Sequence, residues 1–216
     1  MTLRRSALCL VLALLLVPAT IIFFYRFVDP PITPLMLLRL AQGERLRHRS
    51  VPLSSVSPAL VAAVIAAEDN TFCRHHGFDA QALQDEIDNW LAGERPRGAS
   101  TITMQTAKNI FLWPGRDPVR KVLEAWLTPQ IQLLWSKRRI LEVYLNVIEW
   151  GDGIFGAEAA ARYHFGMSAA NIGPEQAAQL AAMVPNPRRY GPGAETRYLH
   201  KRTEIILARM NAATVP

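Results

Sequence analysis

Three clusters of polar residues in the middle of the sequence have types and spacings suited to chemistry. The first begins with Glu68 and Asp69, which directly follow the apolar run ALVAAVIAA and precede Phe72, His75 and His76. A carboxylate at the end of an apolar helix is partly removed from water, which raises its pKa towards the range of a general base. The alternative is a helix cap or a surface ion pair. The histidines are adjacent and lack the HExxH spacing, which argues against a zinc site.

The second cluster is the segment GASTITMQTAKN at residues 98–109. It places Ser100, Thr101, Gln105 and Lys108 at the start of an expected helix. Hydroxyls and a lysine at a helix N-terminus are suited to binding phosphate or another anion. The segment lacks the Walker pattern, so ATP is not indicated. The alternative here is an ordinary capped helix.

The third cluster is RKVLE, which contains Arg120, Lys121 and Glu124. The alternative to a functional role is a simple helical ion pair at a spacing of three or four residues. An apolar and aromatic segment, IFLWP, lies shortly before it at residues 110–114. Its Phe111, Leu112 and Trp113 belong either to the core or to a contact with the membrane interface.

In this order, the clusters resemble the motifs of the peptidoglycan glycosyltransferases, which polymerise bacterial cell-wall glycan from lipid II, and above all of their monofunctional members. The family patterns Glu-Asp-x-x-Phe-x-x-His-x-Gly, Gly-x-Ser-Thr-Ile-x-x-Gln, Arg-Lys-x-x-Glu and Ile-Leu-Glu-x-Tyr-Leu-Asn read here EDNTFCRHHG, GASTITMQ, RKVLE and ILEVYLN. GIFGAEAAARYHFG and LAAMVPNPRRY also fit, so the resemblance covers residues 57–190. It departs from the family at Met104, which replaces a usual glutamine, and at Pro129.

The resemblance implies roles for single residues. Glu68 would take the proton from the 4-hydroxyl of the acceptor sugar, and Glu124 matches the second catalytic glutamate of the family. A lipid pyrophosphate leaves already charged, so it needs nearby cations. Attack opposite this leaving group would give a β-1,4 linkage with inversion. The matching substrate-binding residues are Phe72, His75, Ser100, Thr101, Gln105, Lys108, Arg120 and Lys121.

Glu124 would hold these basic groups or help to bind a divalent cation, Mg²⁺ or Mn²⁺, at the pyrophosphate. No organic cofactor is expected. The implied partners are lipid II, the growing glycan strand and the bilayer, together with transpeptidase or cell-division proteins, and no nucleic acid. Two other functions stay open. A lysozyme-like lytic hydrolase also uses a helical fold and a glutamate, and a membrane-anchored scaffold would have an inactive site.

Helical signals position these clusters. Ser57 and Pro58 are suited to begin one helix, Asp79 to cap another that reaches Leu91, and Ser100 to cap residues 101–111. Residues 119–135 have helical spacing, and Pro129 should kink that helix or begin a new one. Further helices are expected over 35–41, 138–148, 156–163, 174–183 and 195–210. Strand signals are weak, which predicts a mainly α protein. The family resemblance implies a two-lobed, lysozyme-like shape.

The N-terminal segment has a different character. Residues 7–25 carry no charge, and at about 1.5 Å per residue they span roughly 28 Å, close to the thickness of a bilayer core. Arg4 and Arg5 precede them, which places the N-terminus in the cytoplasm. This segment predicts a single-pass membrane protein, and the family resemblance implies that the membrane is the bacterial inner membrane, with the catalytic domain on the periplasmic side. The alternative is a signal peptide cleaved near Ala19.

Composition agrees with this division into a tail and anchor at 1–28, a tether at 29–56 and a glycosyltransferase domain at 57–216. The 216 residues are 50% hydrophobic and 19% charged, which excludes a disordered protein. Three of the six net positive charges come from Arg4, Arg5 and Arg26 in residues 1–28. The only cysteines, Cys9 and Cys73, exclude a disulfide-rich scaffold and would be kept apart by the anchor.

Overall fold

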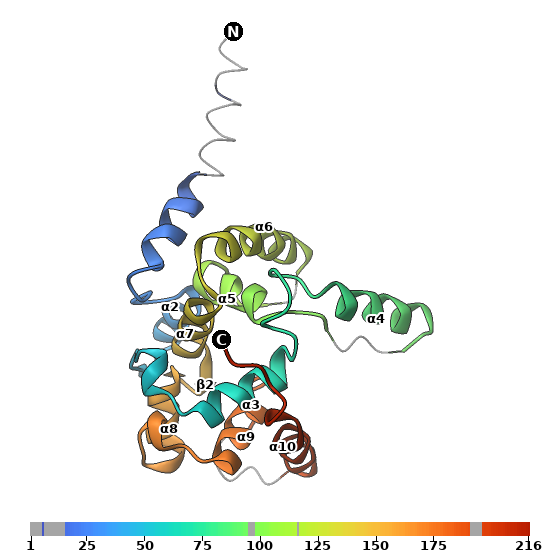
Figure 1. Ribbon diagram of the computed structural model, residues 1–216. Helices are drawn as coiled ribbons and strands as arrows, with labels where there is room; N and C mark the ends of the chain where they lie inside the picture. Colours follow the sequence, from blue (N-terminus) through green and yellow to red (C-terminus); the bar gives the residue numbers. More distant parts are fainter. Residues whose placement is uncertain (1–5, 7–15, 95–97, 116, 191–195) are drawn as a thin grey trace.

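The computed structural model describes residues 6, 16–94, 98–115, 117–190 and 196–216, and it is mainly helical (Figure 1). Residues 16–25 are helical. The labelled helices are α2 (Pro34–Ala41), α3 (Pro58–Glu68), α4 (Ala80–Leu91), α5 (Ile102–Phe111), α6 (Pro118–Leu134), α7 (Lys137–Val147), α8 (Ala157–Phe165), α9 (Pro174–Met183) and α10 (Arg197–Met210), with short 3₁₀ turns at η1 (Leu53–Ser55) and η2 (Ala169–Asn171). The predicted fold class, mainly α, is confirmed.

Local capping explains where the helices around the clusters begin. The Ser57 hydroxyl accepts from the backbone N–H of Ala59 at the start of α3, and Asp79 caps α4 in the same way. The cap of α5 is Thr101, whose hydroxyl accepts from Met104 N, and not Ser100 as predicted. This shift of one residue matters because it leaves the Ser100 hydroxyl available for a contact outside its own helix.

Pro129 lies within α6, which continues through it as one element. Proline removes the N–H that would bond the carbonyl four residues earlier. Here both Pro129 and Ala125 are on the exposed side of the helix, so water can hydrate that carbonyl. Of the two outcomes predicted for Pro129, a kink or the start of a new helix, the second is wrong.

The structure contains a small three-stranded sheet that the sequence patterns did not predict. It consists of β1 (Arg47–His48), β2 (Glu149–Gly151) and β3 (Ile154–Phe155), in the order β1-β3-β2. β1 runs parallel to β3, with Arg47 opposite Ile154, while β2 is antiparallel to β3 with an irregular register. Strands of two or three residues are too short to show alternation of polar and apolar side chains.

The segment expected to be a tether, residues 29–56, packs against the rest of the protein. Besides α2 and β1, it contributes Val51, whose N–H and carbonyl both bond the side-chain amide of Asn146. Arg39 of α2 forms a two-pronged ion pair with Glu149 at 2.8 and 2.9 Å. These contacts join α2 to β2 and the stretch after β1 to α7, so the segment has a fixed path over the domain.

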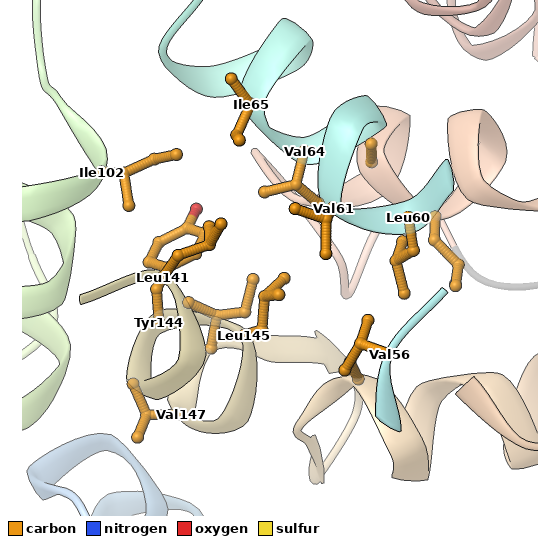
Figure 2. Close-up of a cluster of buried hydrophobic side chains, with 14 of the residues drawn as sticks. Val56, Leu60, Val61, Val64, Ile65, Ile102, Leu141, Tyr144, Leu145 and Val147 are labelled. Atoms are coloured by element: carbon orange, nitrogen blue, oxygen red, sulfur yellow. The ribbon is translucent and has the colours of Figure 1, made fainter. Parts of the chain in front are cut away.

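One continuous hydrophobic core runs through the helices. α3, α9 and α10 pack against one another, and α5 packs against α6 and α7. Figure 2 shows Val64 and Ile65 of α3 near Ile102 of α5 and Tyr144 and Leu141 of α7. A helix that is apolar on all sides, like α3, is stable only when it is surrounded, so the residue that ends it, Glu68, emerges from the centre of the fold. The two-lobed, lysozyme-like shape stays a prediction.

The N-terminal helix is attached to the domain at its end. Trp135 donates its indole N–H to Ile22 O at 2.7 Å, and Arg139 bonds Tyr25 O. Much of the predicted anchor, with Arg4, Arg5 and Cys9, lies outside the described residues. Within the residues that are described, no helix is both long and apolar enough to cross a membrane.

Candidate active site

Glu68 lies on the wall of a cleft of about 270 Å³. It is the last residue of α3, and the cleft is formed there by the loop that follows α3, the start of α4 and the segment before α5. Ser100 and Thr101 line the same cleft. The first and second sequence clusters, about thirty residues apart in the chain, therefore share one hollow of the surface.

Two side chains hold the carboxylate of Glu68. Gln105 of α5 donates to Oε2 at 3.0 Å, and Arg202 of α10 donates to Oε1 at 3.1 Å. The side chain is only 11% exposed. Burial raises the pKa of Glu68, whereas the bond from Gln105 and the charges of Arg202 and Lys108 oppose that rise. A buried carboxylate with a raised pKa and a solvent-facing cleft is suited to accept a proton.

Gln105 is itself oriented by Tyr144 of α7. The buried Tyr144 hydroxyl donates to Oε1 of Gln105 at 2.9 Å, which turns the amide NH₂ of Gln105 towards Glu68. Burial raises the pKa of Tyr144 well above its ordinary value, so the phenol stays a donor. The hydrogen bonds thus run in one direction, from the Tyr144 hydroxyl to Gln105 and from Gln105 to Glu68. Met104, the departure from the family pattern, is buried on the same helix.

Asp69 and His75 connect the loop after α3 to α5. His75 Nε2 lies 2.8 and 3.0 Å from the two oxygens of Asp69, and Asp69 Oδ2 also accepts from the backbone N–H of Ile102. Phe72 is fully buried, with the Lys137 ammonium 4.4 Å from its ring centroid. The family resemblance implied that Phe72 and His75 bind substrate. In the structure the residues that line the cleft do not include them, and both side chains hold the loop that forms its wall.

The basic residues of the third cluster surround Glu124. Arg120 and Lys121 both pair with its buried carboxylate, Lys121 at 3.0 Å. Lys121 also donates to the Ser100 hydroxyl at 2.8 Å, which connects α6 to the cleft wall. Burial lowers the pKa of Lys108, and the charge of Arg120 lowers it further. Cations concentrated in this way favour the arrival of an anionic group.

The donor set does not fit a metal ion held by the protein. Both carboxylate oxygens of Glu124 face cations. Among the described residues, no group of three or more His, Cys, Asp or Glu side chains is close enough to hold a metal. An Mg²⁺ or Mn²⁺ ion would therefore need ligands that a substrate supplies.

The predicted membrane-contact segment is mostly covered. Leu112 is buried, and Phe111 is half-buried with its ring centroid 6.4 Å from that of Tyr25. Trp113 is exposed, and its indole N–H bonds Asp117. A second exposed apolar surface, which was not predicted, lies on α4, and this helix buries none of its residues. Its exposed apolar side chains are Leu83, Ile87, Trp90 and Leu91.

Two residues next to Glu68 also escaped sequence reasoning. Tyr144 stands in the motif ILEVYLN without an assigned role, and Arg202 is one of several charges in the last helix. The spacing of apolar residues could have pointed to Arg202. Arg202 precedes Ile206 and Met210 by four and eight residues, so it belongs to the apolar face of its helix.

A mainly helical domain with a buried glutamate in a cleft, beside a cluster of cations, defines a class of enzyme that can transfer a group from an anionic leaving group. Comparison with known proteins is consistent with this class. The family model Transglycosylase matches residues 36–211. Its range begins inside α2, so it includes most of the segment that was expected to be a tether.

Related proteins are similar in sequence to this protein over almost its whole length. A biosynthetic peptidoglycan transglycosylase from Caulobacter vibrioides is 50% identical over 204 residues, which is 94% of this chain and 89% of the relative. One from Rhodospirillum centenum is 55% identical over 96% of this chain and 90% of the relative. One from Ectopseudomonas mendocina is 46% identical over 97% and 89%. The chain therefore belongs to the transglycosylase family.

Proposed function

We propose that this protein is a peptidoglycan glycosyltransferase that polymerises lipid II into β-1,4 glycan strands with inversion and release of lipid pyrophosphate. The observation that carries the proposal is that Glu68 and Ser100 line the same cleft. Ser100 accepts a hydrogen bond from Lys121, which belongs to the cationic cluster on α6. The names of the relatives, all biosynthetic peptidoglycan transglycosylases, support the same reaction class.

In this reaction Glu68 accepts the proton of the acceptor's 4-hydroxyl while that oxygen forms a bond to C1 of the donor sugar. The bond from C1 to the pyrophosphate oxygen breaks, and its electron pair leaves with the pyrophosphate. Lys108, Arg120 and Lys121 stabilise the charge on the departing group. Ser100 and Thr101 line the cleft in which a substrate would lie.

The remaining predicted site residues position other residues and do not contact the reacting atoms themselves. Glu124 holds Arg120 and Lys121 in place, and Gln105 directs its amide to Glu68. His75 and Phe72 support the loop that forms the cleft wall. A divalent cation would need ligands from the substrate, because Arg120 and Lys121 already pair with the carboxylate of Glu124. Polymerisation measured with and without added Mg²⁺ or Mn²⁺ tests that requirement.

The lytic alternative is not favoured. A hydrolase that cuts finished glycan has no pyrophosphate to stabilise and no need of several cations beside its glutamate. The relatives are also named as biosynthetic enzymes. An inactive scaffold has no need of the bonds that Gln105 and Arg202 make to Glu68.

Attachment to the bacterial inner membrane is part of the proposal. It is supported by the uncharged residues 7–25, by the arginines before them and by the exposed apolar side chains of residues 16–25. Trp113 and the apolar face of α4 are the candidate surfaces for contact with lipid. The catalytic domain would then lie on the periplasmic side, where transpeptidase or cell-division proteins would be its protein partners.

The test is polymerisation of lipid II by the purified full chain in detergent, with the products separated by size. Long glycan strands are the expected result. In a parallel reaction the protein is mixed with preformed, labelled glycan. Shortening of that glycan without any polymer from lipid II would contradict the proposal and restore the lytic reading, while no product in either reaction would favour the scaffold.

A further inference from the structure

Arg202 reaches the proposed base from the far end of the described chain. Its Nη2 lies 3.1 Å from Glu68 Oε1 and 3.4 Å from the carbonyl oxygen of Ala67. The two residues are 134 positions apart in the sequence. Ala67 is in the last turn of α3, where backbone carbonyls lack helical N–H donors. One guanidinium therefore contacts both the end of α3 and the side chain that emerges from it.

Packing of α10 positions this arginine. Arg202, Ile206 and Met210 recur at intervals of four residues and share one face of the helix. Ile206 and Met210 are buried, at 2% and 4% exposure. That face packs against α3 and α9. Since the core fixes the rotation of α10, the direction of Arg202 towards Glu68 is a consequence of the fold and not a chance surface contact.

The position of Glu68 disfavours its ionised form. It is buried, and it stands at the C-terminal end of α3, where the helix dipole disfavours negative charge. The ionisable groups that face it are Arg202 from α10, Lys108 from α5, Tyr144 from α7 and Asp69 next to it in the chain. Asp69 and the phenol of Tyr144 do not stabilise a carboxylate charge. Among the described residues, Arg202 is the cation in direct contact with Glu68.

We propose that Arg202 is a positioning residue that keeps Glu68 ionised and holds Oε1 while the acceptor hydroxyl gives up its proton. The inference deepens the proposed function, because it assumes that Glu68 is the base. A carboxylate oxygen can accept more than one hydrogen bond. Arg202 on Oε1 and Gln105 on Oε2 therefore leave acceptor capacity on both oxygens for the incoming hydroxyl.

The test compares pH–rate profiles of lipid II polymerisation for the wild type, Arg202→Met, Arg202→Lys and the control Lys201→Gln. Met keeps the unbranched apolar stem of the side chain without its charge. We expect Arg202→Met to lose at least about tenfold in kcat/KM on the acid side of the profile and much less on the alkaline side, because an uncompensated carboxylate protonates more readily. Arg202→Lys should lie between Met and the wild type. Lys201 is exposed on the same helix, so its variant should match the wild type.

Two results would overturn the inference. One is an unchanged profile in a folded Arg202 variant. The other is a rise in KM of equal size at every pH, which would make Arg202 a contact of the substrate. Circular dichroism melting checks folding, and if Arg202→Met does not fold, Arg202→Lys decides by the same criteria. Glu68→Gln is measured in parallel. Activity retained there removes Glu68 from the base role, a failure of the proposed function that is distinct from a failure of the Arg202 assignment.

Discussion

At the scale of single residues, the chemistry proposed for Glu68 depends on groups that three different helices supply. α5 contributes Gln105, α7 contributes Tyr144 and α10 contributes Arg202. Each donates a hydrogen bond towards the carboxylate or towards the amide that bonds it. The geometry of the base is therefore determined by how these helices pack, and the loss of any one donor should reduce catalysis.

Glu68→Gln is expected to reduce lipid II polymerisation by at least about 100-fold, because an amide cannot take up the proton of the acceptor hydroxyl. Its single carbonyl oxygen can accept from Arg202 or from Gln105 but not from both in the present arrangement, so the melting temperature should fall slightly while the protein stays folded. Glu204→Gln, at an exposed position on α10, is the matched control. Strand synthesis by Glu68→Gln at the wild-type rate would remove Glu68 from the role of base.

Tyr144→Phe removes the donor to Gln105 Oε1. A buried polar atom left without its partner costs about 1–3 kcal/mol, and because Gln105 is only half-buried the free energy of unfolding should fall towards the lower end of that range. The amide of Gln105 also loses its fixed direction, and kcat should fall several-fold. Tyr163→Phe at an exposed position is the control. Denaturant unfolding and initial polymerisation rates measure the two effects, and wild-type values for both would contradict the proposed chain of bonds.

At the scale of elements, the cleft depends on how the loop after α3 meets the start of α5. Asp69 accepts from the first N–H of α5, and the Thr101 hydroxyl donates to Gly77 O at 2.6 Å. Gly77 itself has φ +94°, a conformation that glycine adopts more easily than other residues. It also lies close to α6, because a Cβ at this position would be 2.9 Å from Thr128 Cγ2. Gly77 thus brings the end of the first motif against both neighbouring helices.

Gly77→Ala should therefore lower the free energy of unfolding by about 2–4 kcal/mol, through backbone strain together with the clash against α6. Gly93→Ala is a matched control, since Gly93 has φ +79° but open space around its Cα. It should cost only the strain, about 1–2 kcal/mol. Chemical denaturation of both variants gives the comparison. Equal losses would mean that the close approach to Thr128 does not constrain the loop.

At the scale of the whole molecule, the N-terminal helix and the catalytic domain form one connected body at residues 22–29. Arg139 donates to Tyr25 O at 2.8 and 3.1 Å and pairs with Asp29 at 2.7 Å. Trp135 adds its bond to Ile22 O. If the helix continues into the membrane as proposed, these contacts fix the direction of the cleft relative to the bilayer, which suits an enzyme whose substrate keeps its lipid tail in that bilayer.

Arg139→Met should release the end of the N-terminal helix. Charge-assisted hydrogen bonds contribute about 1.5–3 kcal/mol each, so amide exchange at residues 22–29 should become faster in detergent micelles. The exposed neighbour Arg138→Met is the control and should leave exchange unchanged. Hydrogen–deuterium exchange measured by mass spectrometry makes the comparison. Protection equal to the wild type in Arg139→Met would show that the helix is held by other contacts.

The sequence by itself determined the helices and the residues of the motifs. Caps such as Ser57 and Asp79, and apolar spacing along α6 and α7, act within a few residues, so they can be recognised without knowing the fold. The tertiary structure decided which residues meet. It brought Tyr144 and Arg202 to Glu68, buried Phe72 and paired β1 with β3. These contacts join residues far apart in the chain, and their energy comes from burial and hydrogen bonding that exist only once the helices have packed.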